Sequence, residues 1–438
     1  MRASLAHLPI ARPKATGRSR AGSRRLSAYG AVLLALGLVG GCNHRPDLNA
    51  GPTPLRGTAY VVIGSYGQEQ LSQAVVKEQK ELVELLESDF RQLHPGVKLE
   101  VTLARESLIA RDLAASDRDG LAPDLLLVSG TLARELHQQK LTQPATLTPE
   151  LARLLRPHLR DRITDANNQL VGVPMLLEPQ LACFNRKRLA SSPRTLAALE
   201  ATSERGIEVG MPINPIDLYW TVGAMGANDA LIRATQRQRL TPKQQQALLI
   251  WLRWLRSANL RERVNFFSHQ EALLQGLMQG QLDWITCRST SLRRLRQSLG
   301  ERLGVAVLPS GPAGAPTPLM RQRVWVLGRD SSPTQKEIAA AFTRFSLSPM
   351  MQRFLTLHTQ EMLPVNREVS MPSGSSPVLQ AMVASERQSH AADGISNRLK
   401  SGTPRLERLS AVLLELIYGE RTPEQTRSAL VMLLGGLP

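Results

Sequence analysis

The sequence predicts an α/β protein of two domains, each a sheet flanked by helices. Its 438 residues exceed what one compact core of typical size holds. Within 58–139, runs rich in β-branched residues alternate with runs of helical periodicity, as in a doubly wound α/β domain. The hydrophobic fraction of 42% excludes a disordered chain. A proline-broken extended segment in mid-chain suits a crossing between the two domains.

The first domain is predicted from alternating strands and helices. The elements are, in order, a strand at 58–64, a helix at 74–93 ended by His94-Pro-Gly96, a strand at 97–103, a helix at 108–115, a strand at 122–130 and a helix at 131–139. In such sheets ligands lie beyond the carboxyl ends of the strands. Four residues that end or follow strands are therefore candidates for a binding site: Ser65, Tyr66, Ser129 and Gly130.

The mid-chain segment consists of two short extended runs, 171–173 and 180–184, separated by Pro174 and Pro179. Each proline removes an amide donor and biases the residue before it away from helix. Glu178 lies inside this break. Its carboxylate is either a solvated turn residue or a polar group held over a pocket, and the residues alone leave both readings open.

The second half of the chain continues the mixed pattern. Its predicted elements are a helix at 196–203, a strand at 208–212, a helix capped by Asn214, helices at 244–257 and 271–279, a strand at 280–287, a helix at 291–299, strands at 304–309 and 323–327, helices at 334–347 and 349–356, and a mainly helical tail to 433.

Residues 1–41 have the pattern of a secretory signal peptide. A basic region is followed by an apolar run at 31–39, which is too short for a membrane span of about 20 residues, and by small residues. The sequence Val39-Gly-Gly-Cys42 resembles the lipobox of bacterial lipoproteins, which implies that Cys42 is lipidated and becomes the first mature residue. Residues 42–57 are then a lipidated cysteine and a tether rich in Pro and Gly.

The net charge of +17 raises the question of nucleic-acid binding. Seven of the basic residues lie in 1–41, and the remaining surplus is scattered along the chain. No stripe of interleaved basic and aromatic residues is present, and aromatic residues make up only 4%. We therefore predict a solvated basic surface and no nucleic-acid partner.

Two cysteines remain in the body of the chain, Cys183 and Cys287, both in extended apolar runs. Buried thiols are the first interpretation and a bridge between them is the second. The eight histidines are dispersed and show no metal-ligand spacing, so no metal site is predicted. The chain also lacks a nucleophile elbow and a phosphate loop, which predicts neither an enzyme nor a cofactor.

Several short motifs occur in an order that resembles one known family. They are His94-Pro-Gly96, Ala122-Pro-Asp124, the crossing from Gly172 to Asn185, Pro193-Arg-Thr195, the strand and loop from Val305 to Pro312, and Leu363-Pro-Val-Asn366. This order is similar to that of the family 1 extracellular solute-binding proteins of ABC transporters, the group of maltose- and glycerol-phosphate-binding proteins. The resemblance covers residues 58–433.

The resemblance implies a two-lobed periplasmic-binding-protein fold of type II, with hinge crossings between the lobes. Lobe one would comprise 58–178 and 310–345, and lobe two 179–309 and 346–438. The implied protein is a monomeric, lipid-anchored component of the cell envelope that captures a small polar solute, such as a sugar or polyol, and delivers it to membrane permease subunits. The implied ligand-binding residues are Ser65, Tyr66, Ser129, Gly130, Glu178, Asn214, Asp217, Arg288, Ser289 and Thr290.

One departure from the family bears on the ligand. Sugar pockets stack pyranose rings on aromatic faces, whereas these candidate loops are rich in Ser, Thr, Asn, Asp and Arg. A long oligosaccharide is therefore less favoured than a small polyol, a short sugar, or an anion paired with Arg288. The alternative is an interaction lipoprotein that keeps the fold and binds no ligand.

Overall fold

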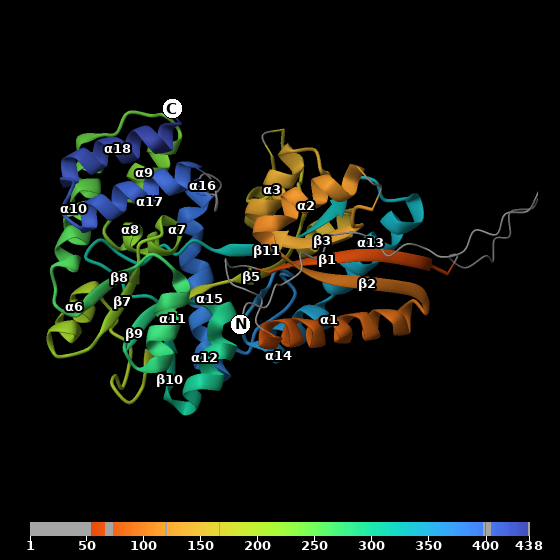
Figure 1. Cartoon of the computed structure of the whole chain (residues 1–438), viewed down its shortest axis with the longest axis horizontal. Coiled ribbons are helices and arrows are strands. Elements are labelled where there is room, and N and C mark those ends of the chain that lie inside the picture. Colours follow the sequence, from red (N-terminus) through yellow and green to blue (C-terminus); the bar gives the residue numbers. More distant parts are fainter. Residues whose placement is uncertain are drawn as a thin grey trace, which may run out of the picture.

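Two sheets lie side by side along the long axis of the molecule, each with its own helices (Figure 1). The computed structural model describes residues 54–65, 73–118, 121–165, 167–396, 399 and 404–436. The predicted signal peptide, Cys42 and most of the tether lie outside these residues, as does Tyr66. Within the described ranges, no helix is long and apolar enough to cross a bilayer.

The first sheet has seven strands, in the order β12-β5-β11-β3-β1-β2 with β4 beside β11. Their bounds are β1 Arg56–Ser65, β2 Gly96–Arg105, β3 Leu125–Ser129, β4 Thr142–Gln143, β5 Val173–Glu178, β11 Arg321–Gly328 and β12 Leu363–Pro364. Strands β1, β2 and β3 are parallel, and β11 is antiparallel to both β3 and β5. The carboxyl ends of β1, β2, β3 and β5 and the amino end of β11 therefore meet at one edge.

The helices of this lobe pack on both faces of its sheet. They are α1 Gln73–Leu93, α2 Glu106–Arg118, α3 Gly130–Gln138, α4 Pro149–Leu154, α5 Pro157–Asp161, α13 Pro333–Ser346 and α14 Pro349–Thr359. Local chemistry fixes their starts: Ser129 caps α3 by accepting the Leu132 N–H at 3.2 Å, and Ser332 and Gln335 form a capping box at α13.

The second sheet has five strands, in the order β10-β6-β9-β7-β8. Their bounds are β6 Gln180–Asn185, β7 Val209–Pro212, β8 Val264–Phe267, β9 Trp284–Arg288 and β10 Leu303–Ala306. Around them lie α6 Leu196–Glu204, α7 Pro215–Leu218, α8 Trp220–Ala224, α9 Asn228–Thr235, α10 Pro242–Asn259, α11 Gln270–Gln279, α12 Leu292–Leu299, α15 Pro377–Ser389, α16 Asp393–Ser396, α17 Pro404–Ile417 and α18 Pro423–Gly435. The mainly helical tail that the sequence predicted is confirmed by α15, α16, α17 and α18.

The chain crosses between the lobes three times. It passes from β5 to β6 at Pro179, from β10 back to β11, and from β12 to α15, which packs on β6 and β10. Helix α15 therefore lies at the junction between the lobes (Figure 1), where the Ser385 hydroxyl donates to the Gln180 carbonyl at 2.7 Å.

The assignment of 346–438 to lobe two is wrong for its first part. Strand β12 pairs with β5 in the first sheet, and α14 precedes it. The buried Gln352 of α14 explains this position, because its amide donates to the Met175 carbonyl at 2.9 Å and accepts the Val365 N–H at 2.9 Å. A two-residue strand has no periodicity that could have revealed it from the sequence.

The interpretation of Cys183 and Cys287 as free thiols is also wrong. The two form a disulfide with a Cα–Cα distance of 5.8 Å. They lie on β6 and β9, which are antiparallel neighbours, and this pairing brings together cysteines that are 104 residues apart in sequence.

Candidate functional site

A cavity of about 1360 Å³ lies between the two lobes. One wall is the sheet edge formed by the ends of β1, β3, β5 and β11, and the other includes residues that follow β7 and β9. In the second sheet, β7 and β9 are parallel, so their carboxyl ends also share an edge. The topology of each sheet thus directs its polar strand ends into the same cavity.

The first wall contains a largely buried ion pair between Glu106 and Arg323. Glu106 Oε1 lies 2.6 Å from Arg323 Nη1 and also accepts the Ser129 N–H at 2.7 Å. Arg323 donates further to the carbonyl oxygens of Leu127, at 2.8 Å, and of Gly64. Both charges are therefore satisfied by protein groups, and the pair holds β1, β3 and β11 together at their ends.

The second wall contains Asp217 between Arg288 and Arg321. Arg288 Nε donates to Asp217 Oδ1 at 2.9 Å, its Nη1 donates to the Leu319 carbonyl at 2.7 Å, and Arg321 Nη2 lies 3.4 Å from Asp217 Oδ1. Burial acts to raise the pKa of Asp217, but the charges of Arg288 and Arg321 outweigh it, so the pKa lies below its ordinary value. Asp217 is thus a carboxylate that joins the two lobes, because Arg321 comes from β11.

Arg288 does not suit the role of anion receptor that the sequence suggested. Its side chain is only 3% exposed, and its donors are committed to Asp217 and to the Leu319 carbonyl. An anion would have to displace these partners, which makes the predicted pairing unfavourable.

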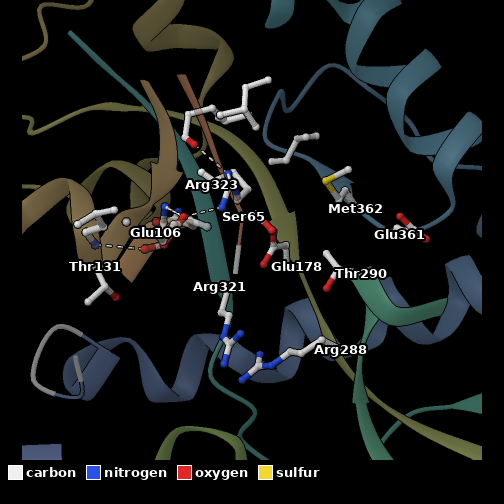
Figure 2. Close-up of a pocket in the computed structure, with 18 of the residues that line it drawn as sticks. Ser65, Glu106, Thr131, Glu178, Arg288, Thr290, Arg321, Arg323, Glu361 and Met362 are labelled. Atoms are coloured by element: carbon white, nitrogen blue, oxygen red, sulfur yellow. Dashed lines mark hydrogen bonds and ion pairs between the residues drawn. The ribbon is translucent and has the colours of Figure 1, made fainter. Parts of the chain in front are cut away.

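Glu178 differs from the other acids of the cavity. It is the last residue of β5, it is 3% exposed, and its Oε2 has no hydrogen-bond partner among the described residues. Burial raises the pKa of Glu178, although Arg323 and Arg321 oppose this effect. Figure 2 shows its carboxylate in the centre of the cavity, between Ser65 and Arg323 on one side and Thr290 on the other. Of the two readings of Glu178, the polar group over a pocket is confirmed.

The structure brings eight of the ten predicted site residues to this cavity: Ser65, Ser129, Gly130, Glu178, Asn214, Asp217, Arg288 and Thr290. The prediction that Ser289 binds the ligand is wrong, because its side chain is fully buried and does not line the cavity. Asn214 caps α7, where its Oδ1 accepts the Ile216 N–H at 2.9 Å. Ligand contact by these residues stays a prediction.

Comparison with solved structures identifies this architecture. MalX from Streptococcus pneumoniae in complex with maltopentaose superposes with a TM-score of 0.68 at 16% identity, covering 86% of this chain and 99% of that one. A solute-binding protein from Thermotoga lettingae bound to α-D-tagatose gives 0.64 at 15% identity, covering 86% and 98%. The chain has the type II solute-binding-protein fold. No protein-family model and no curated protein matches the sequence.

Within this solute-binding fold, sequence reasoning missed most of the charged residues that line the cavity, among them Glu106, Arg321 and Arg323. A signal for Glu106 existed, since it directly follows a predicted strand, as Ser65 and Ser129 do. Arg321 and Arg323 were harder to find, because they lie at the amino end of an antiparallel strand, where the rule for parallel strands does not apply.

The aromatic content of the cavity agrees with the predicted departure from sugar-stacking pockets. Among the described residues that line the cavity, the aromatic ones are Trp325 and Phe342. Both are buried in the apolar core. The Trp325 indole donates to the Ser346 hydroxyl at 3.0 Å, so its ring faces the interior. The described part of this solute-binding fold therefore offers a ligand polar contacts rather than a stacking platform.

Proposed function

We propose that this protein is the substrate-binding lipoprotein of an ABC importer and that it captures a small, uncharged, polyhydroxylated solute, such as a short sugar, a polyol or a sugar derivative, between its lobes. The observation that carries the proposal is Glu178, a buried carboxylate at the centre of an interlobe cavity, whose Oε2 has no hydrogen-bond partner in the described part of the chain. A buried acceptor in this state is costly unless something donates to it. Ligand hydroxyls would supply that donor.

The charges around the cavity support a ligand without net charge. Glu106 pairs with Arg323, and Asp217 pairs with Arg288 and Arg321. Among the described residues that line the cavity, seven acids and seven arginines are present, so their formal charges cancel. A strongly charged ligand would have to break one of these pairs, whereas hydroxyl groups can bind beside them.

The solved structures with this fold agree with a carbohydrate-like ligand. MalX was solved in complex with maltopentaose and the Thermotoga lettingae protein with α-D-tagatose. The cavity of about 1360 Å³ exceeds the 300–1,000 Å³ of many ligand pockets. It is therefore large enough for a ligand to enter before the lobes close.

Such a protein would act without chemistry. A ligand that contacts both walls binds the closed arrangement more tightly than the open one and shifts the population by that difference. Asp217 and Arg321, which come from different lobes, already lie 3.4 Å apart and link the two walls. The closed form would then dock on permease subunits, while a lipidated Cys42 holds the protein at the envelope membrane.

The test is a thermal-shift screen of the full chain, purified in detergent, against short sugars, maltodextrins, polyols, sugar phosphates and amino acids. A ligand at 100 times its Kd should add about 2.7 kcal/mol of stability, which is a shift of several degrees. Small-angle scattering should then show compaction with the same ligand.

Glu178→Ala should weaken binding of the ligand found, while Glu262→Ala, whose side chain is 87% exposed, should not. A flat result over the whole panel would contradict the proposal and would favour an interaction lipoprotein that binds no solute. A response to sugar phosphates or amino acids alone would contradict the uncharged ligand.

A further inference from the structure

A second cluster of chemically active side chains lies outside the cavity, at the junction between the lobes. His158 comes from α5, which packs against β5 of the first sheet. Glu386 comes from α15, and His390 begins the 3₁₀ turn directly after it. The sequence predicted no metal site, because 228 or more residues separate His158 from the other two.

The spacing of these three groups suits a tetrahedral metal ion. Ligand atoms about 2.1 Å from such an ion lie about 3.4 Å from one another. His390 Nε2 lies 2.9 Å from Glu386 Oε1, and His158 Nε2 lies 3.6 Å from the same oxygen. One ligand atom from each of the three side chains lies within 4.8 Å of the others. Side-chain rotations can therefore bring the three ligand atoms to this spacing without a movement of the backbone elements that carry them.

The state of His158 is the second observation. Its Nε2 is buried and has no hydrogen-bond partner among the described residues, because 3.6 Å to Glu386 is too long. The His158 and His390 rings also have centroids only 4.3 Å apart.

Arg156 is the group that competes with a metal for Glu386. Its Nη1 donates to Glu386 Oε1 at 2.9 Å. A carboxylate has about four acceptor positions on two oxygens, so it can accept from an arginine and still bind a metal. Arg156 would then fix the orientation of the Glu386 carboxylate, as hydrogen-bond partners of metal ligands commonly do.

We propose that His158, Glu386 and His390 bind one Zn²⁺ ion, with water as the fourth ligand. Two imidazoles and a carboxylate are a known zinc ligand set, whereas Ca²⁺ and Mg²⁺ prefer sites made of oxygen alone. The side chain of His390 is 43% exposed, which leaves a path for the ion and room for water. Zinc here joins α5 of one lobe to the helix at the lobe junction.

The experiment titrates zinc into the metal-stripped full chain in detergent and measures binding by calorimetry and the change in melting temperature. We expect one zinc ion per chain and a higher melting temperature. His158→Ala and His390→Ala should each weaken zinc binding at least about tenfold. His358→Ala is the matched control, because His358 is an exposed histidine stacked on Phe354 and should bind zinc as the wild type does.

Zinc affinity should also fall in acidic buffer, because protons compete with the metal for the ligand atoms. His390 is half-exposed, so its variant should fold even if the His158 variant does not, and circular dichroism checks this. Absence of zinc binding, equal binding by wild type and the His390 variant, or stabilisation by Mg²⁺ or Ca²⁺ in place of zinc would each overturn the proposal.

Discussion

Two buried carboxylates of the cavity, Glu178 and Asp217, are equally inaccessible to solvent but differ in charge environment. Asp217 receives hydrogen bonds from Arg288 and lies beside Arg321, so its pKa is held below the ordinary value. Glu178 Oε2 accepts no hydrogen bond from the described residues, and burial raises the pKa of this carboxyl group. Asp217 therefore helps to hold the lobes together. Glu178 is available to bind a ligand, but its buried charge lowers the stability of the ligand-free protein.

This cost predicts the effect of Glu178→Gln. A folded pKa above the ordinary value of 4.5 means that the ionised carboxylate destabilises the fold, and that this penalty grows as the pH rises above 4.5 and vanishes below it. The variant should therefore be more stable than the wild type at neutral pH, by about 1–3 kcal/mol. Urea unfolding at acidic and neutral pH measures the difference. A variant that is less stable at neutral pH would show that the charge is compensated.

At the scale of elements, α5 and α15 are joined through Glu386. Burial acts to raise the pKa of Glu386, but His158, His390 and Arg156 outweigh it and lower the pKa to about 2. A folded pKa below the ordinary 4.5 gives stability that is complete above pH 4.5 and is lost as the pH falls towards 2.

Glu386→Gln should accordingly lower the free energy of unfolding at neutral pH by up to about 3 kcal/mol. The loss should shrink as the pH approaches 2, because the wild-type carboxylate is then protonated too. Denaturant titrations across this range provide the measurement. A difference that stays constant with pH would mean that Glu386 acts through packing alone.

Close packing between elements predicts a second structural effect at Gly328, the last residue of β11. A Cβ added there would overlap the carbonyl oxygen of Pro123, which is backbone and cannot move aside. Gly328→Ala should therefore destabilise the protein by at least about 1–3 kcal/mol. Gly374→Ala is the control, because a Cβ at Gly374 would meet nothing within 4 Å. Equal melting temperatures of the two variants would contradict this reading of the β11 edge.

The elements that the sequence predicted well are those with a long or regular pattern. Helix α1 and strand β2 differ from their predicted bounds by a residue or two, because periodicity and His94-Pro-Gly96 define them. The short β4 and β12 and the helices α4 and α5 were not identified, since two to six residues show no period. In the site, strand-end residues were found, while Arg321, Arg323 and the histidine cluster depend on pairing across long separations.

For the whole molecule, the disulfide between Cys183 and Cys287 restrains most of the second lobe. It closes a loop of 104 residues, which constrains the unfolded chain strongly. The double variant Cys183→Ala/Cys287→Ala should lose about 2–4 kcal/mol of stability. Denaturant unfolding with and without reductant measures this: reductant should lower the wild type to the level of the variant and leave the variant unchanged. A reductant effect of equal size on both would show that the bridge is not the cause.

The triple crossing of the chain has a consequence for the order in which the lobes can be completed during synthesis. All five strands of the second sheet come from one continuous stretch, 180–306. The first sheet begins earlier, but β11 lies between β3 and β5, and β12 flanks β5 on the other side. Until residues 321–328 have been made, β5 has no link to β3 and the first sheet is in two pieces. The sheet that starts second along the chain is thus the first that can be finished, and the early strands must wait for β11 with their edges unpaired.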